Sequence, residues 1–239
     1  MMAGRPMLDV RGLAAVYGWA QILFDLSLSV GRGEVAVLLG RNGAGKSTTL
    51  KSIVGLVRPS GGSVTFQGTE IAGMAPHRIV RMGLGYVPEE RRIFTDLTVA
   101  ENLEVGRQPP RGDAPAWSVD KLFELFPNLA EMQGRPAGQM SGGEQQMLTV
   151  ARTLMGNPSL VLLDEPSEGL APLIVDQMAA TIRALKNGGL SILLSEQNLR
   201  FAQMVSDRAY IIEKGRIQWQ GSMKDLAADE AVKQQYLVI

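Results

Sequence analysis

Residues 40–48 read GRNGAGKST and match the spacing G-x-x-x-x-G-K-[ST]. An apolar run, 35–39, precedes this motif, and a helix-compatible stretch, 46–54, follows it, which is the strand, loop and helix context that the motif needs. Its glycines let backbone N–H groups turn inward around phosphate oxygens, and the positive end of the following helix adds to the attraction. We expect Lys46 to reach the β- and γ-phosphates of a nucleotide and the Ser47 hydroxyl to bind Mg²⁺. The residues of this phosphate loop are Gly40, Arg41, Asn42, Gly43, Ala44, Gly45, Lys46, Ser47 and Thr48.

A second motif, LVLLDEP, covers residues 160–166. Its short continuous apolar run predicts a strand that is buried on both faces of a parallel sheet. Two carboxylates end the strand. Asp164 is placed to hold Mg²⁺, directly or through water, and Glu165 is placed to polarise the water that attacks the γ-phosphate.

A third segment, residues 140–146, reads MSGGEQQ and precedes an apolar-periodic stretch. Ser141 and Glu144 have the spacing of a capping box, which predicts that a helix begins there. The two glycines leave N–H donors free at that helix end, so the segment predicts a second anion-binding site. Its residues are Ser141, Gly142 and Gly143.

This third segment resembles the L-S-G-G-Q signature of ATP-binding-cassette (ABC) ATPases, with Met140 in place of Leu and Glu144 in place of Gln. The phosphate loop, the signature and the Asp-Glu strand follow in the order of that family, and the resemblance covers essentially the whole chain. It implies an α/β fold with a phosphate-loop NTPase core and a mostly parallel sheet. An N-terminal antiparallel β flap and a helical signature subdomain complete the implied architecture, and the implied ligands are ATP and Mg²⁺.

The pattern of the remaining chain fits that architecture. Short apolar runs alternate with Gly turns over 7–39, and with a strand at 63–67 they predict the antiparallel flap. We place a mostly helical subdomain at about 95–156, with a capping box at 98–101 and a helix at 119–126. Alternating strands and helices elsewhere predict a mostly parallel sheet in a single domain, 1–239. The strands are 84–87, 160–164, 190–194 and 208–213, the helices are 172–186 and 198–205, and two short helices follow from about 222.

Composition excludes several classes of protein. The 239 residues carry 24 basic and 24 acidic side chains, so the net charge is zero and nothing favours nucleic acid as a partner. Cysteine is absent, which excludes disulfides and zinc-thiolate sites. The start, residues 1–6, lacks the apolar core of a signal peptide, and no segment approaches about 18 uninterrupted apolar residues. We expect a peripheral protein on the cytoplasmic face of the inner membrane, attached through a partner.

The resemblance also assigns a residue to the adenine base. Tyr17 stands where ABC ATPases place an aromatic ring that stacks on adenine, a contact worth about 1–3 kcal/mol in related contexts. Trp19 lies close by in the sequence and is an alternative stacking platform.

Three positions depart from the commonest family pattern. Glu89 replaces a Gln that touches Mg²⁺ and the attacking water; a glutamate can still bind Mg²⁺ but adds negative charge near the γ-phosphate. Gln197 replaces the switch His, and an amide can orient water but cannot transfer a proton at neutral pH. Ala171 replaces an Asp that reaches across the dimer. From Glu89 and Gln197 we expect this chain's own site to hydrolyse ATP slowly, with the partner's site carrying most of the turnover.

These departures occur together in one subgroup, the second ATPase of importers for branched-chain (hydrophobic) amino acids. The shared motifs are YVPE (86–89), GGEQQML (142–148), EGLAP (168–172) and EQN (196–198). The resemblance implies a second ABC ATPase subunit, identical or different, two membrane permeases and, indirectly, a periplasmic solute-binding protein. The ATPase does not touch the solute, so importers of urea or short amides stay open as alternatives.

The implied mechanism places each ATP between the phosphate loop of one subunit and the signature of another, with the permease on a groove beside 89–94. ATP must bind the closed dimer better than ADP does. Other classes fit less well. ABC proteins of chromosome organisation carry long coiled-coil insertions, which are absent here, and no N-K-x-D motif of a GTPase is present. An exporter ATPase is the closest rival, and a non-transport ABC ATPase is a more distant one.

Overall fold

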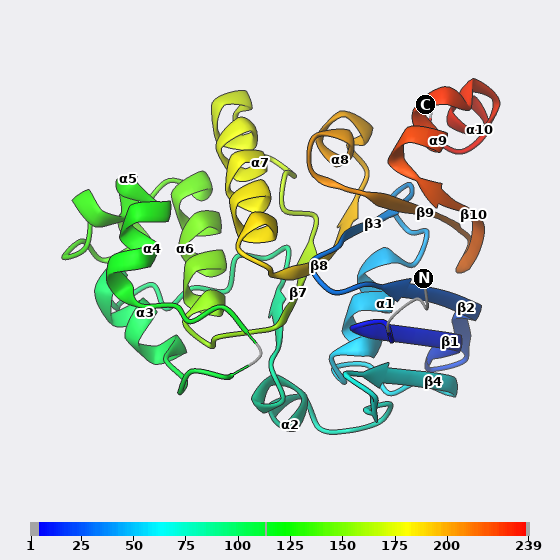
Figure 1. Ribbon diagram of the computed structural model, residues 1–239, viewed down its shortest axis with the longest axis horizontal. Coiled ribbons are helices and arrows are strands. Elements are labelled where there is room, and N and C mark those ends of the chain that lie inside the picture. Colours follow the sequence, from blue (N-terminus) through cyan, green and yellow to red (C-terminus); the bar gives the residue numbers. More distant parts are fainter. Residues whose placement is uncertain (1–4, 113, 238–239) are drawn as a thin grey trace.

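The computed structural model describes residues 5–112 and 114–237. Residues 1–4, on which most of the sequence prediction for the start of the chain falls, lie outside this range, as do residue 113 and the last two residues. Two sheets and a set of helices make up the fold (Figure 1). Among the described residues, no helix is long and apolar enough to cross a bilayer.

The larger sheet has six strands in the order β10-β9-β3-β8-β7-β6. Strands β9, β3, β8, β7 and β6 run parallel, and β10 pairs antiparallel with β9 at one edge. The prediction of a mostly parallel sheet is confirmed, but the edge strand β10 was not predicted. The strands are β3 (Val35–Leu39), β6 (Leu84–Val87), β7 (Leu160–Asp164), β8 (Ser191–Glu196), β9 (Arg208–Glu213) and β10 (Arg216–Ser222).

Both faces of this sheet are covered, which explains why its central strands are apolar without alternation. All five residues of β3 are buried. Val37 faces a core shared with the helices that follow β6, β7 and β8, whereas Leu38 faces a core shared with α1 (Lys46–Ile53) and the smaller sheet. A strand read as one continuous apolar run therefore contributes to two separate cores.

The smaller sheet is the predicted antiparallel flap, with the order β2-β1-β4-β5. Bulges interrupt the pairing of β1 with both neighbours, and Gly12 adopts a positive φ of 59° at one of them. A glycine is suited to this place because it adopts that conformation without strain. The strands are β1 (Leu8–Tyr17), β2 (Ala20–Val30), β4 (Gly61–Phe66) and β5 (Thr69–Glu70).

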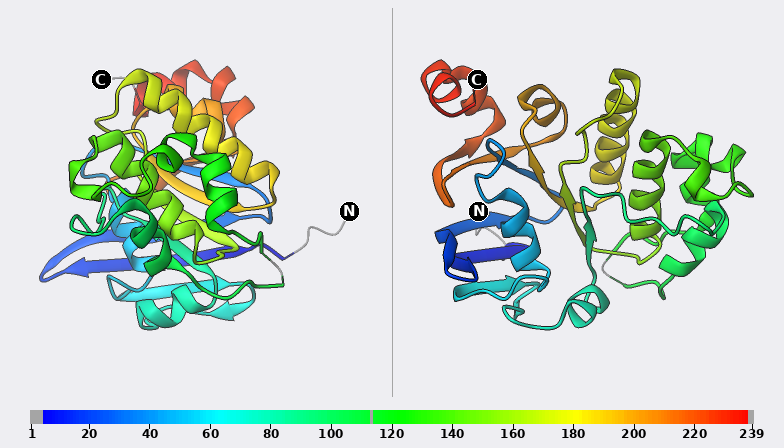
Figure 2. Two further views of the ribbon diagram at one scale, coloured as in Figure 1. Left: turned by 90° about the vertical axis from the view of Figure 1, so that its left-hand side faces the viewer. Right: turned by 180° about the vertical axis from the view of Figure 1, so that it is seen from behind.

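Four helices lie between β6 and β7 in sequence, and they occupy the end of the molecule opposite to the smaller sheet (Figures 1 and 2). Two of them begin as predicted, because Thr98 with Glu101 and Ser141 with Glu144 both form complete capping boxes. The helices are α3 (Val99–Gly106), α4 (Val119–Leu125), α5 (Pro127–Glu131) and α6 (Gly142–Leu154).

The remaining helices cover the larger sheet or its edges. Helix α7 extends one residue beyond its predicted end, and the two predicted C-terminal helices are present. These helices are α2 (Pro76–Arg81), α7 (Pro172–Asn187), α8 (Leu199–Val205), α9 (Met223–Ala228) and α10 (Glu230–Tyr236), and a 3₁₀ turn spans Ala137–Gln139.

One buried hydroxyl joins the two sheets. Tyr210 of β9 donates to the carbonyl of Ser29 in β2 at 2.9 Å and accepts from the N–H of Ser29 at 3.0 Å. The tyrosine side chain is among the largest fully buried ones. It therefore fixes β2 beside the parallel sheet.

Tyr210→Phe is expected to lower the free energy of unfolding by about 1–2 kcal/mol, because it leaves both backbone groups of Ser29 without their partner. Urea unfolding followed by circular dichroism measures this loss. Tyr236→Phe is the matched control, since that hydroxyl only accepts from the neighbouring, exposed side chain of Gln235. Equal urea concentrations at the unfolding midpoint for the two variants would contradict the bridging role of Tyr210.

Candidate functional site

A pocket of about 400 Å³ opens where the phosphate loop joins β3 to α1. Gly45 has a φ of 109°, a conformation that suits glycine, and it turns the chain into α1, whose first residue is Lys46. The N-terminal end of α1 thus points its free N–H groups and positive dipole end at the pocket. The pocket is lined by Tyr17, Ile22, Asn42, Gly43, Gly45, Lys46, Ser47, Thr48, Glu89, Glu165 and Glu168.

The ammonium group of Lys46 links the loop to the end of β7. Its Nζ donates to the carbonyls of Gly40 at 2.7 Å and Arg41 at 3.1 Å, and lies 3.0 Å from Oε1 of Glu165. Lys46 and Glu165 are both buried. Each charge therefore offsets part of the desolvation cost of the other, and the pair holds the lysine head beside the pocket.

The carboxylate of Asp164 is the centre of a hydrogen-bond network at the carboxyl ends of three strands. The Ser47 hydroxyl donates to its Oδ1 at 3.0 Å, and the Ser195 hydroxyl donates to the same oxygen at 2.7 Å. Tyr86 donates to Oδ2 at 3.0 Å. Burial together with the charge of Asp164 raises the pKa of Tyr86, so this phenol stays a donor. The network orients a carboxylate that is only 1% exposed.

Two of these partners, Tyr86 and Ser195, were missed by sequence reasoning. Both lie on strands that flank β7, and Ser195 pairs with Asp164 in the parallel register. Carboxyl ends of neighbouring parallel strands meet at one sheet edge, so a polar residue at the end of each predicted strand was the available signal.

Glu165 begins the turn after β7 with a φ of 47°, which is uncommon for a residue other than glycine. Its N–H lies 3.1 Å from the Ser195 hydroxyl and 3.2 Å from the Ser195 carbonyl. Strained backbone of this kind is held by its surroundings and is often found at functional sites. Here it turns the side chain back toward the phosphate loop, where it meets Lys46.

Two further carboxyl groups face Glu165. A hydrogen bond with Glu165, then burial and the charges of Glu165 and Glu89, raise the pKa of Glu168 from 4.5 to about 7. Burial, followed by the charges of Glu165, Asp164 and Glu90, raises the pKa of Glu89. Since one lysine faces several carboxyl groups, Glu168 holds a proton over part of the physiological pH range. Glu168 was not predicted as part of the site.

The two aromatic candidates for base stacking differ in whether they line the pocket. Tyr17 ends β1 and lines the pocket while staying 48% exposed, so its ring is free to meet a planar ligand. Trp19 is fully exposed at the tip of the hairpin and does not line the pocket.

Other predicted site residues lie outside the lining of the pocket. Asp164 is buried and bonded to Ser47 of the lining, and Gly40, Arg41 and Ala44 belong to the loop but are not among the lining residues. Gln197 directly follows β8 and is not part of the lining. Residues 141–143 form the start of α6, in the helical segment, so one chain does not bring them to its own phosphate loop.

The residues present fit a Mg²⁺ ion that is shared with a nucleotide. Within the described part of the chain, no three His, Cys, Asp or Glu side chains form a group that could hold a metal. Mg²⁺ in nucleotide sites is instead bound through one or two protein ligands plus phosphate oxygens. The hydroxyl of Ser47 and the carboxylate of Asp164, 3.0 Å apart, are hard oxygen donors of that kind.

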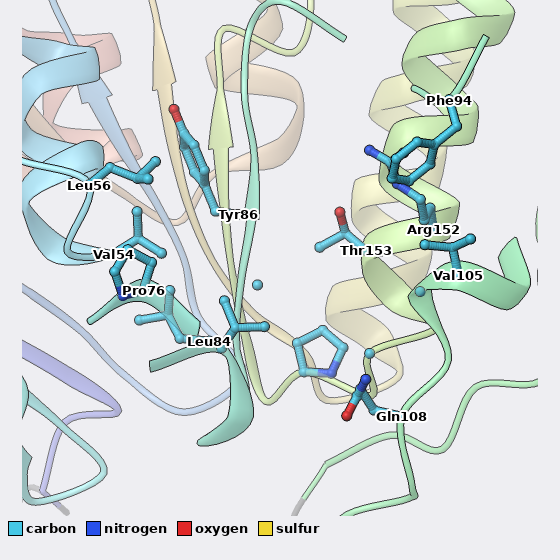
Figure 3. Close-up of a pocket in the computed structure, with 15 residues that line it drawn as sticks. Val54, Leu56, Pro76, Leu84, Tyr86, Phe94, Val105, Gln108, Arg152 and Thr153 are labelled. Atoms are coloured by element: carbon cyan, nitrogen blue, oxygen red, sulfur yellow. The ribbon is translucent and has the colours of Figure 1, made fainter. Parts of the chain in front are cut away.

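A second pocket, of about 450 Å³, lies between the core and the helical segment (Figure 3). Leu56 and Leu84 line it on one side, and Phe94 and Arg152 on the other. The guanidinium of Arg152 lies over the Phe94 ring, 4.9 Å from its centroid, while Phe94 stays 48% exposed. This pocket is mostly apolar, and one cation borders it.

Comparison with known proteins identifies the class. The profile of the ABC transporter family matches residues 23–168. The chain is 43% identical to the high-affinity branched-chain amino acid transport ATP-binding protein BraG of Pseudomonas aeruginosa, over 97% of this chain and 99% of that protein. It is 37% identical to the lipopolysaccharide export system ATP-binding protein LptB of Haemophilus influenzae, over 97% of each chain. A nucleotide-free ATP-binding cassette from an ABC transporter matches with a TM-score of 0.83 and 26% identity, over 98% of this chain and 100% of that one.

The chain therefore belongs to the ABC transporter family, and its fold is that of an ABC ATPase. It is the ATPase subunit of an ABC transporter, which binds ATP and couples ATP hydrolysis to transport. ABC ATPases dimerise and pair with membrane permease subunits.

The raised pKa of Glu168 makes stability depend on pH. A carboxyl group whose pKa is higher in the folded chain contributes stability that is fully present below about pH 4.5 and is lost as the pH rises through about 7. Glu168→Gln is expected to flatten the pH dependence of the melting temperature across this window. Glu230→Gln, an exposed carboxyl that pairs with Lys233 far from the pocket, is the control. An unchanged pH profile in Glu168→Gln would contradict the assignment.

Proposed function

We propose that this chain is the second ATPase subunit of an importer for branched-chain or other hydrophobic amino acids. The identity of 43% to the branched-chain ATPase BraG, over nearly the full length of both chains, carries this proposal. The motifs at 86–89, 142–148, 168–172 and 196–198 support it, because they resemble those of the same subgroup. An importer of urea or short amides is the alternative. The 37% identity to LptB keeps a lipopolysaccharide exporter as a rival.

In this proposal the phosphate loop and the end of β7 divide the work on ATP. Lys46 binds the β- and γ-phosphates, and the hydroxyl of Ser47 and the carboxylate of Asp164 hold Mg²⁺. When bound, the ion neutralises charge on the phosphate oxygens. Glu165 polarises the attacking water as general base. The remaining loop residues, 40–45 and Thr48, surround the phosphates, and Tyr17 stacks on adenine.

In this proposal, two residues that differ from the commonest family pattern make ATP hydrolysis slow at this chain's own site. Glu89 would contact Mg²⁺ but brings a further carboxyl group beside Glu165, whose charge helps to raise the pKa of Glu89 and the pKa of Glu168. Gln197 orients water but cannot transfer a proton. The partner's site then carries most of the turnover, while this chain lends Ser141, Gly142 and Gly143 to it.

The apolar pocket is the docking place that we propose for the permease. It lies beside residues 89–94, and exposed Phe94 offers an aromatic anchor of the kind that dominates interfaces (Figure 3). The chain would then sit on the cytoplasmic face of the inner membrane, and a periplasmic solute-binding protein would act through the permease. The whole chain serves as a single cassette, with the helical subdomain of about 95–156 inserted in the core.

ATP hydrolysis by this chain, alone and with the ATPase encoded beside it, tests the site. Lys46→Ala is expected to lose nucleotide binding, and Glu165→Gln to keep binding but lower the kcat of this chain alone by about 10²-fold or more. Little activity alone and strong activity in the mixture supports a weak own site. Robust activity of the lone chain, lost in Glu165→Gln, would show that Gln197 suffices and that the weak-site proposal is wrong.

Uptake of radiolabelled leucine tests the solute. A strain without this gene is expected to lose uptake, the wild-type gene to restore it, and Lys46→Ala to leave it absent. Phe94→Ala is expected to lower uptake while ATP binding to the purified chain stays unchanged, because only the permease contact is lost. Loss of urea uptake with normal leucine uptake would favour the alternative importer, and loss of surface lipopolysaccharide would favour the exporter.

A further inference from the structure

Glu196, the last residue of β8, is a buried carboxylate to which the reaction above assigns no role. Glu196 is only 2% exposed. None of the ion pairs found among residues 5–112 and 114–237 includes it. Burial of a carboxylate without a cation is costly unless hydrogen bonds compensate it.

Backbone donors from both sides of the site provide that compensation. Oε1 of Glu196 accepts from the N–H of Ser167 at 3.0 Å, and Oε2 accepts from the N–H of Asn198 at 3.2 Å. Its own carbonyl accepts from the N–H of Gly40 at 3.2 Å. One residue therefore joins the turn after Glu165, the segment that carries Gln197 and the first glycine of the phosphate loop.

A carboxylate is the side chain that this geometry requires. Both of its oxygens accept, whereas the amide of a glutamine would turn an NH₂ group toward one of the two N–H donors. Charge-assisted hydrogen bonds to backbone N–H groups are also stronger than neutral ones. Burial, and to a smaller degree the charge of Glu165, raises the pKa of Glu196. Hydrogen bonds from the side chain and N–H of Ser167 and from the N–H of Asn198 oppose this rise.

We propose that Glu196 is a positioning residue for ATP hydrolysis. It fixes the turn at 165–168 and the segment at 197–198 to the start of the phosphate loop, so that Glu165 and Gln197 move as one unit with the phosphates. This inference rests on the roles proposed for Glu165 and Gln197. It also explains the order of residues in the EQN motif at 196–198. Glu196 stands directly before Gln197, and its Oε2 accepts from the N–H of the residue after that glutamine, Asn198.

Glu196→Gln, measured in the slow hydrolysis by this chain alone so that the partner's site does not contribute, is expected to lower kcat at least tenfold while the ATP concentration for half-maximal rate stays within twofold. The phosphate loop is unchanged, so binding is spared and the alignment of Glu165 is lost. Asn157→Ala is the control, because Asn157 is equally buried and holds two backbone groups of loops far from the pocket. It is expected to lower the melting temperature and leave kcat unchanged.

A second pair of variants isolates one hydrogen bond. Asn198 has a φ of −77°, which proline can adopt, so Asn198→Pro removes the N–H that Glu196 accepts. Asn198→Ala loses the same helix cap but keeps that N–H. We expect the proline variant to have a kcat at least threefold below that of the alanine variant.

The outcomes separate the inference from the function on which it rests. Wild-type kcat in Glu196→Gln, or a loss of kcat that merely follows the melting temperature as in Asn157→Ala, overturns the positioning role. Equal kcat in the proline and alanine variants overturns it as well. Undiminished hydrolysis in Glu165→Gln would instead show that the proposed function of the site is wrong.

Discussion

The arrangement of the site depends on the burial of one carboxylate, that of Asp164, at the edge where parallel strands end. Hydroxyl groups from α1, β6 and β8 donate to it, so the phosphate loop and three strands are held in a common register. A buried charge tolerates little displacement of its donors, because each lost hydrogen bond costs desolvation energy in full. The network therefore acts as the rigid frame against which the neighbouring Glu165 and Lys46 are placed.

Around that frame the site is rich in negative charge. Lys46 is the cation that pairs with Glu165, yet Glu89 and Glu168 lie near the same carboxylate, and the pKa of each is raised in part by its charge. Such crowding is compatible with a ligand that brings its own cation, as a nucleotide with Mg²⁺ does. The same crowding gives Glu165 a neighbour, Glu168, whose pKa is raised to about 7.

Much of this could be predicted from the sequence, because local signals are strong where the fold is locally determined. The phosphate loop, the apolar strand that ends in Asp164 and the capping box at Ser141 each carry spacing rules within a few residues. Tyr86, Ser195 and Glu196 could not be found this way. Their roles depend on which strands are neighbours in the sheet. Strand β8 pairs with both β7 and β3, and only the folded structure shows this pairing. The edge strand β10 was missed because its exposed alternate residues give a weak apolar pattern.

Strand β8 also explains how a site split between segments can act together. Its last two residues contact the neighbouring segments, since Ser195 donates to Asp164 and Glu196 accepts from the N–H groups of Ser167 and Asn198. Gln197 is the first residue after the strand. The carboxylate of Glu196 thus links the segment at 197–198 to the turn at 165–168 through an N–H group of each. Residues 169–171 lead from that turn to α7, whose Ile174 lies against Gly143 at the start of α6. These contacts join residues of different motifs, so each motif can be read from the sequence whereas the contacts between them cannot.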